Sequence, residues 1–188
     1  MVQDGSLLES SCPFITEKLG EMEIESIQPY EMLSALPESA RKRFYDMAGF
    51  DYDEFAALFD ASPKKNLVII GTSHGSEESA RQQRDYVARI VEQYGEGYDI
   101  FFKPHPDTSS AGYEIEFPGL TLLPGQMPFE IFVWALIDRV DMIGGYPSTV
   151  FLTVPLDKVR FIFAANAESM ARPLNILFRD ATDVEWMQ

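Results

Sequence analysis

The amino-acid sequence predicts an α/β fold, with a single Rossmann-like domain built on a parallel sheet and an N-terminal helical appendage. Downstream of residue 63, short apolar runs alternate with helix-patterned segments, which is typical of βαβ units. The run NLVIIG at residues 66–71 is apolar throughout, as expected for a strand covered on both faces of a parallel sheet. Upstream of this run the pattern is helical only. With 46% hydrophobic residues among 188, the chain can bury a sizeable core.

The pattern divides the chain into three segments. Residues 1–23 show weak periodicity, so we expect a loose arm. Residues 24–62 have apolar residues at three- and four-residue spacing and a glycine stop at Gly49, which predicts two short helices as an appendage. Residues 63–188 form the predicted Rossmann-like domain.

The elements of residues 63–188 follow in order. The strand at 66–71 leads to Ser76, a typical N-cap with glutamates in the first turn, and the helix that follows ends at Gly95. A strand at 98–103 completes a βαβ unit, for which we expect a right-handed crossover. Short strands at 120–125 and 139–145 surround a helix that starts near Pro128, and another strand covers 159–165. The helix after Ser76 is expected to have an apolar face formed by Ala80, Val87, Ile90, Val91 and Tyr94.

Charge and composition argue against several functional classes. A formal net charge of −15 repels a polyanion such as DNA or RNA, although a local cation cluster can still hold one small anion. The chain lacks the roughly 20 uninterrupted apolar residues of a membrane helix, and its N-terminus lacks the pattern of a signal peptide. We therefore expect a cytoplasmic protein, with the inner face of the membrane as one place where it could act. A single cysteine, Cys12, and two histidines predict neither an internal disulfide nor a usual zinc site.

Three polar turns follow predicted strands, at the carboxyl ends where open α/β sheets bind ligands. The first turn is GTSHGS at 71–76, where Gly71, Thr72 and Ser73 are small enough to let the backbone approach a ligand beside a helix N-terminus. It lacks the glycines and the lysine of a P-loop. On this stretch alone, an ordinary capped turn is the favoured interpretation.

The second turn is KPHP at 103–106. Pro104 and Pro106 restrict the backbone on both sides of His105, so the imidazole is presented at low entropic cost, with Lys103 at the tip of the strand. A histidine can bond a phosphate oxygen and stabilise the negative charge that develops on a leaving group. The alternative is a histidine that bonds a loop carbonyl.

The third turn is GGYPSTVF at 144–151, where Ser148 and Thr149 stand at the expected start of a helix and offer two hydroxyls to an anion. Its alternative is a serine that acts only as an N-cap. Between the second and third turns, Glu130 lies early in an apolar helix. It could accept bonds from ribose hydroxyls or only complement the helix dipole.

The order of these motifs resembles that of a known family. A strand followed by K-x-H-P, then F-E-[IV], then G-G-x-x-S-[ST]-[VL]-[FY] resembles the donor-nucleotide domain of bacterial sialyltransferases of glycosyltransferase family 80, the Pasteurella-type enzymes with a GT-B fold. The family motifs are KGHP, SFEV and GGxASSLYF. The resemblance covers roughly residues 24–178, and it implies that this chain forms one half of a GT-B fold.

The resemblance implies roles for individual residues. His105 would bond the phosphate of CMP and assist its departure from C2 of the sugar. Ser148 and Thr149 would hold the same phosphate, and Glu130 would bond the ribose hydroxyls. The other implied residues frame the donor: Lys103 with Pro104 and Pro106 on the cytosine side, and Gly71, Thr72 and Ser73 along the cleft that faces the acceptor domain.

The implied reaction is inverting transfer from CMP-sialic acid, or a related CMP-sugar, to a glycan hydroxyl in polysaccharide biosynthesis. The resemblance implies no metal and no other cofactor. A carboxylate of the other GT-B domain would deprotonate the acceptor hydroxyl. The partners are therefore a CMP-sugar, a glycan acceptor and a separate or missing acceptor domain.

The sequence departs from the family pattern at three places. Gly75 stands where the family has a tryptophan, and Pro104 replaces the glycine of KGHP, which removes a backbone N–H donor. The chain also has residues for only one of two Rossmann-like domains, so we expect it to be incomplete as an enzyme on its own. The N-terminal VQDGS resembles the family's acidic DDGS motif, which would make Asp4 the catalytic base; the alternative is a turn in a flexible arm.

Other functional classes stay open. One is a non-catalytic CMP-sugar or nucleotide-binding module that works with a separate acceptor-binding chain. Another is an interaction domain that has lost its ligand, although the polar residues at the strand ends argue against it. A phosphatase or hydrolase that uses His74 or His105 ranks last, because the sequence offers no paired nucleophile and no carboxylate–histidine cluster for a metal.

Overall fold

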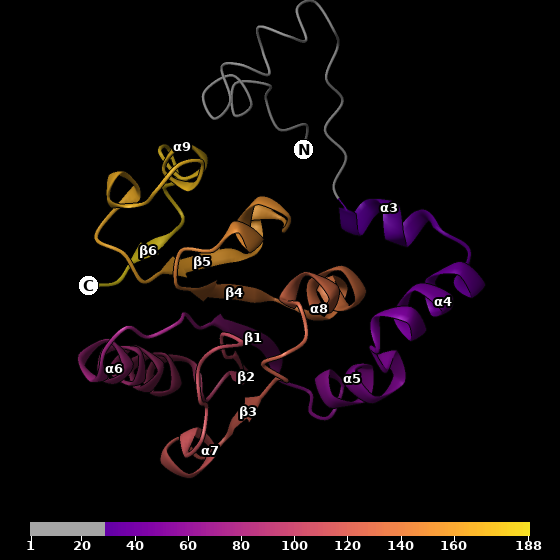
Figure 1. The fold of residues 1–188 in the computed structure, drawn as a ribbon, viewed down its shortest axis with the longest axis horizontal. Helices are drawn as coiled ribbons and strands as arrows, with labels where there is room; N and C mark the ends of the chain where they lie inside the picture. The colour runs from indigo at the N-terminus through magenta and orange to yellow at the C-terminus, as the bar shows by residue number, and fades with distance from the viewer. Residues whose placement is uncertain (1–28) are drawn as a thin grey trace, which may run out of the picture.

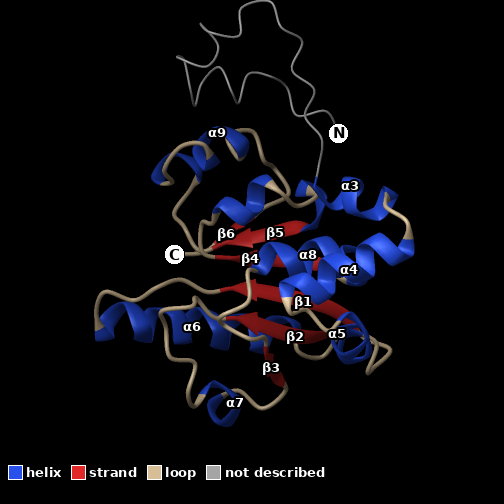
Figure 2. Ribbon diagram, turned by 45° about the vertical axis from the view of Figure 1, so that its right-hand side comes forward, coloured by secondary structure: helices blue, strands red, loops and turns tan. Residues whose placement is uncertain are grey.

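The structure, a computed structural model, describes residues 29–188 and contains a six-stranded sheet in which every pair of neighbouring strands is parallel (Figures 1 and 2). The strand order is β3-β2-β1-β4-β5-β6. The strands are β1 (Lys65–Ile70), β2 (Tyr98–Lys103), β3 (Leu120–Leu122), β4 (Met142–Gly145), β5 (Val159–Ile162) and β6 (Glu185–Trp186). The chain runs outward from β1 through β2 to β3 and then returns to the other side of β1, which is the order of a doubly wound fold.

The predicted α/β fold with a parallel sheet is confirmed. Strand β2 has the predicted bounds, and β1, β3, β4 and β5 overlap the ranges expected for them. Strand β6 was not predicted, because two residues carry no periodicity that a pattern could reveal.

Two hydrophobic cores cover the two faces of the sheet. Along β1, Val68 and Ile70 belong to one core, whereas Leu67 and Ile69 belong to the other, as the alternation of a strand requires. The first core contains residues of α3 (Pro29–Ala35), α4 (Glu38–Ala48), α5 (Tyr52–Phe59), α8 (Phe129–Leu136) and α9 (Leu174–Leu177). The second contains residues of α6 (Glu77–Tyr94) and α7 (Tyr113–Glu116). In Figure 1, α6 lies on one side of the sheet, with α5 and α8 on the other.

Within its described residues, 29–62, the N-terminal appendage contains three helices where the sequence pattern predicted two. Pro37 has an extended backbone conformation and directly precedes α4, so it separates α3 from α4. The predicted stop at Gly49 is confirmed, since this residue caps α4 in the left-handed conformation, with a φ of 66°. The expected loose arm, with Asp4 and Cys12, lies outside the described residues.

Helix α6 begins and ends where the sequence predicted. The Ser76 hydroxyl accepts a hydrogen bond from the backbone N–H of Ser79, and Gly95 follows the last helical residue. Val87 and Ile90 are fully buried, as expected of the apolar face. The remaining short elements are the 3-10 helices η1 (Ile137–Arg139), η2 (Thr149–Leu152), η3 (Leu156–Lys158) and η4 (Ala167–Ser169). Within residues 29–188, no helix is both long enough and apolar enough to cross a membrane.

Candidate functional site

The three polar turns emerge side by side from adjacent strands. Ile70 at the end of β1 pairs with Lys103 of β2 on one side and with Gly145 of β4 on the other. Neighbouring strands lie about 4.8 Å apart, so the chain segments that leave these three residues begin next to one another. The β1–β4 boundary is also the point where the strand order reverses, which is where open α/β sheets bind their ligands.

Gly145 allows the closest backbone approach at this edge. Its φ of 129° lies in a region that favours glycine, and a Cβ atom there would stand 2.2 Å from the carbonyl oxygen of Ile70. The backbone N–H of the next residue, Tyr146, donates to that same oxygen. Gly145 of the double glycine therefore serves the join between β4 and β1, whereas a Cβ atom on Gly144 would meet the Phe161 ring of β5.

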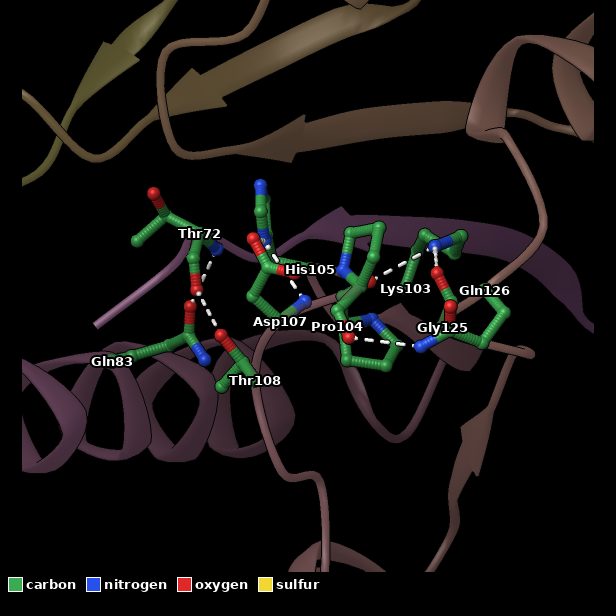
Figure 3. A network of polar contacts seen from close by, with 10 residues as sticks. Thr72, Gln83, Lys103, Pro104, His105, Asp107, Thr108, Gly125 and Gln126 are labelled. Carbon is green, nitrogen blue, oxygen red and sulfur yellow. Dashed lines mark hydrogen bonds and ion pairs between the residues drawn. The ribbon is translucent and has the colours of Figure 1, made fainter.

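His105 lies on the tip of β2 with one ring nitrogen engaged. Its Nδ1 accepts a hydrogen bond from the backbone N–H of Asp107 (3.2 Å), and the Asp107 carboxylate lies 3.7 Å from the same nitrogen. The other nitrogen, Nε2, has no hydrogen-bond partner within residues 29–188, and the side chain is 39% exposed. Figure 3 shows Nε2 directed away from Asp107. The alternative of a histidine that bonds a loop carbonyl is not what the structure contains.

Lys103 is buried rather than displayed. The residue is 4% exposed, and its Nζ donates to the carbonyl oxygens of Pro104 (2.9 Å) and Gly125 (2.8 Å) (Figure 3). Burial lowers the pKa of the Lys103 ammonium to about 8, against an opposing effect of the Glu130 charge. The side chain therefore holds together the backbone around it, and any contribution to a ligand on this edge comes through that backbone.

The first turn is held by a residue that the sequence pattern missed. Gln83 of α6 is fully buried, and its Oε1 accepts a hydrogen bond from the backbone N–H of Thr72 (2.8 Å). On the other side, the Thr108 hydroxyl donates to the Thr72 carbonyl oxygen (3.2 Å). A signal for Gln83 was present, because it lies three residues after Ala80 and four before Val87, and so it interrupts the apolar face with an amide.

Gln83 also fixes the state of His74. Because its Oε1 takes the Thr72 N–H, its Nε2 must donate to the Tyr113 hydroxyl (3.0 Å) and to Nε2 of His74 (3.1 Å). The proton of a neutral His74 therefore lies on Nδ1, a buried atom without a partner among the described residues. Burial, followed by the charges of Arg84 and His105, lowers the pKa of His74, which favours the neutral ring.

The third turn enters a short 3-10 helix. Ser148 caps η2 by accepting a hydrogen bond from the backbone N–H of Val150 (3.3 Å), so the predicted helix start is in place, but the helix has only four residues. Thr149 is exposed, and its hydroxyl has no hydrogen bond within the described part of the chain. One hydroxyl of the pair is thus partly used, and the other is free to bond a ligand.

Glu130 lies in the first turn of α8, directly after the loop that Lys103 holds. The side chain is half-buried, and no hydrogen bond to its carboxylate occurs among residues 29–188. The structure therefore leaves it available as an acceptor. Within the same residues, no group of three or more histidine, cysteine, aspartate or glutamate side chains is placed to hold a metal ion.

A cavity of about 710 Å³ lies elsewhere, between the N-terminal helices and the end of α8. Its lining mixes Arg41 and Lys42 with Glu38 and Asp46, and Arg139 in its wall is already engaged by Asp60. Because charges of both signs are interspersed there, the cavity favours no one ligand charge.

The fold has known counterparts among solved structures. The α/β-galactoside α-2,3-sialyltransferase of Photobacterium phosphoreum matches with a TM-score of 0.70 and 22% identity, over 97% of this chain and 52% of that one. The GT-B domain of a Photobacterium damselae sialyltransferase gives 0.67 and 23%, over 93% and 50%. A 2,6-sialyltransferase of a Photobacterium species, solved with CMP and lactose, gives 0.61 and 19%, over 86% and 37%.

The similarity to these structures concerns the fold, and it covers only part of each of them. No family model matches the chain, and no curated protein matches its sequence. The chain spans about half of each solved structure, or less. It has the Rossmann-like fold found in the GT-B domains of bacterial sialyltransferases.

Proposed function

We propose that this chain is the donor-binding half of a sialyltransferase-like glycosyltransferase of the Pasteurella type, in glycosyltransferase family 80. Its ligand is a CMP-sugar, CMP-sialic acid or a related donor, and the reaction is inverting transfer to a glycan hydroxyl. The observation that carries the proposal is the alignment of three strand ends, Ile70, Lys103 and Gly145, which gathers the polar turns at the point where the strand order reverses. The similarity of the fold to sialyltransferases, one of them solved with CMP, supports it.

His105 would stabilise the charge on the departing CMP. In the neutral ring, Nδ1 accepts the Asp107 N–H, so the proton lies on Nε2. In the protonated ring, Nδ1–H can interact electrostatically with the Asp107 carboxylate, 3.7 Å away. Nε2 carries a hydrogen in both states and remains a donor to a phosphate oxygen as negative charge develops there. The Asp107 N–H thus selects the tautomer of the neutral ring in which Nε2 is the donor.

The remaining contacts to the nucleotide and the cleft would come from several elements. The hydroxyls of Ser148 and Thr149, which follow β4, would bond the phosphate together with His105. Glu130 on α8 would accept bonds from the ribose hydroxyls. The backbone of residues 103–106 would frame the cytosine, and Gly71, Thr72 and Ser73 would line the cleft towards the acceptor. We assign no metal to this reaction, because these donors supply the charge stabilisation that a metal would otherwise provide.

The acceptor side of the reaction would come from another domain. A carboxylate there would take the proton of the acceptor hydroxyl as that oxygen attacks C2 of the sugar and the bond from C2 to the CMP oxygen breaks. Asp4 remains a candidate for this base, outside the described residues. Action in polysaccharide biosynthesis in the cytoplasm would place this half where a CMP-sugar is available.

Calorimetric titration with CMP, and with UMP and AMP as controls, tests the proposal. We expect selective binding of CMP and a loss of affinity of about tenfold or more in His105→Ala, the range for a hydrogen bond to a charged group. His74→Ala is the matched control, since it removes the other histidine from the same edge and should cost far less. Equal losses in the two variants, with both folded by circular dichroism, would remove His105 from its role.

A non-catalytic CMP-sugar-binding module is the second candidate, because groups without a partner among residues 29–188, such as Nε2 of His105 and the Glu130 carboxylate, can hold a nucleotide without any transfer. Such a module would bind CMP with the same selectivity but would transfer no sugar until a partner with the acceptor site is added. An assay of sugar transfer with the chain alone and with a candidate acceptor domain separates the two. A folded chain that binds no nucleotide would instead indicate an interaction domain.

A further inference from the structure

Lys103 joins two segments that are far apart in the sequence. Its Nζ lies 2.9 Å from the Pro104 carbonyl oxygen, on the tip of β2, and 2.8 Å from that of Gly125, in the loop between β3 and α8. Figure 3 shows the ammonium between the two carbonyls. Because the residue is 4% exposed, both hydrogen bonds are shielded from water, which strengthens them relative to the same bonds on a surface.

Two further contacts close the same pair of segments. Gln126 Nε2 donates to the Pro106 carbonyl oxygen (3.0 Å), and a Cβ atom on Gly125 would come within 3.4 Å of the Pro104 ring. The tip of β2 and the loop before α8 are therefore linked on both sides of His105. We call residues 103–106 and 125–126 with these bonds the Lys103 clamp.

The clamp connects His105, which is assigned to the phosphate, with the segment that leads to Glu130, which is assigned to the ribose. His105 belongs to the clamped segment 103–106. Glu130 lies in the first turn of α8, four residues after the end of the clamped segment 125–126. We propose that Lys103 is a positioning residue that fixes the spacing between His105 and Glu130, and so makes ribose recognition dependent on phosphate recognition. The inference rests on the proposed function, and in it the Lys103 side chain touches no ligand.

The clamp makes a prediction that simple support of the fold does not. The ribose contact can add to the affinity only if Glu130 stands at the correct distance from the bound phosphate. Titration with CMP and with 2′-deoxy-CMP measures that contact as a ratio of affinities. In the native chain we expect CMP to bind about tenfold more tightly, the effect of one hydrogen bond to a carboxylate. In Lys103→Met the ratio should fall towards one.

Lys158 provides the matched control. Its Nζ also donates to two backbone carbonyl oxygens, those of Ile137 and Val140, at the opposite edge of the sheet. Lys158→Met should lower the melting temperature but leave the CMP to 2′-deoxy-CMP ratio unchanged. If Lys103→Met fails to fold, Gln126→Leu, which changes an exposed residue, should lower the ratio in the same direction by a smaller factor. A ratio that is unchanged, with both affinities lowered equally, would overturn the clamp.

A measurement without ligand separates the clamp from the proposed function. The backbone N–H of Leu123 donates to the Phe102 carbonyl oxygen (2.9 Å) just before the clamped loop. Hydrogen exchange at this amide should accelerate at least severalfold in Lys103→Met and stay unchanged in Lys158→Met. If the native chain binds no CMP, the proposed function fails while this exchange still tests the clamp. If exchange is unaffected in Lys103→Met, the clamp is wrong whatever the chain binds.

Discussion

At both edges of the sheet a lysine bridges two backbone carbonyl oxygens, but the edges differ in the polar groups that have no hydrogen-bond partner. Lys158 at the amino edge and Lys103 at the carboxyl edge each bridge two carbonyl oxygens. At the amino edge, Asn66 Nδ2 also bonds the carbonyl oxygens of Phe59 and Arg139, and Arg139 is paired with Asp60. These bonds at the amino edge all go to groups of the fold itself, and Asn66 Oδ1 is buried without a partner among residues 29–188.

The carboxyl edge contains polar groups that have no hydrogen-bond partner in the described part of the chain. Nε2 of His105, the Thr149 hydroxyl and the Glu130 carboxylate have no hydrogen-bond partner among residues 29–188, although Lys103 and Gln83 hold the backbone beside them. The carboxyl edge therefore combines a fixed backbone with donors and acceptors that have no hydrogen-bond partner among residues 29–188, whereas Asn66 Nδ2, Arg139 and Lys158 at the amino edge bond groups of the fold itself. That combination is the physical basis for assigning the ligand to the carboxyl edge.

The largest expected effect concerns the join at the centre of the carboxyl edge. Gly145→Ala should destabilise the chain by about 3 kcal/mol, because the new Cβ would lie 2.2 Å from the Ile70 oxygen at a φ of 129°. Denaturant unfolding measures the change. Gly97→Ala, at a position with no atom within 4 Å, is the control and should stay within about 0.5 kcal/mol. Equal effects at the two glycines would mean that β4 does not approach β1 as described.

The next effect probes the closed character of the amino edge. Asn66→Ala should cost about 2 kcal/mol of unfolding free energy, because it leaves the Phe59 and Arg139 carbonyl oxygens without their donor. CMP affinity should not change. Lys64→Met removes a single bond from an exposed lysine to the Gly95 carbonyl oxygen and should have little effect on either quantity. A loss of CMP affinity in Asn66→Ala would contradict the separation of the two edges.

A smaller effect should appear in the pH dependence of stability. The folded-state pKa of Lys103 is about 8, below its ordinary value of 10.5, so the unfolded chain binds more protons between these values. The free energy of unfolding should therefore gain a rising contribution from about pH 8 to 10.5, with a slope below about 1.4 kcal/mol per pH unit, the limit for one proton. Urea unfolding at pH 7.5, 8.5 and 9.5 measures it. Lys103→Met should lose this contribution, and an identical slope in the variant would contradict the assignment.

The smallest expected effect is a difference in tautomer between the two histidines, which is measured without unfolding the chain. Neutral His105 should carry its proton on Nε2, because Asp107 donates to Nδ1, whereas His74 should carry it on Nδ1, because Gln83 donates to Nε2. Nitrogen-15 chemical shifts of the imidazoles at pH 8 report the tautomer of each ring. In Gln83→Leu, His74 should lose its preference while His105 keeps it. The same tautomer in both rings of the native chain would contradict the hydrogen bonds described.

Much of the sheet could be predicted from the sequence, because buried parallel strands such as 66–71 and 98–103 form uninterrupted apolar runs. Helix α6 could also be predicted from the sequence, since Ser76 and Gly95 mark its ends. The third N-terminal helix was missed because Pro37 is a weak signal within a continuous helical pattern. Strand β6 depends on pairing with β5 and has no local signal of its own.

The candidate site was predictable as a set of residues but not as a geometry. The motifs placed His105, Ser148 and Thr149 after strand ends and Glu130 early in a helix, and the parallel register aligns the ends of β1, β2 and β4. The sequence could not show that Lys103 is buried, because the carbonyl that captures its ammonium belongs to Gly125, more than twenty residues away. Gln83 was missed for a similar reason, since its partners Thr72 and Tyr113 lie on other elements.

The most direct test of the central claim is a titration with CMP observed at the two imidazoles, the only ones in the chain. We predict that the Nε2 resonance of His105 shifts progressively and saturates with CMP, while equal concentrations of UMP and AMP shift it much less. His74, whose Nε2 is held by Gln83, should respond weakly. If CMP leaves the His105 resonances unchanged in a folded chain, the carboxyl edge does not hold the nucleotide, and the proposed donor-binding role is wrong.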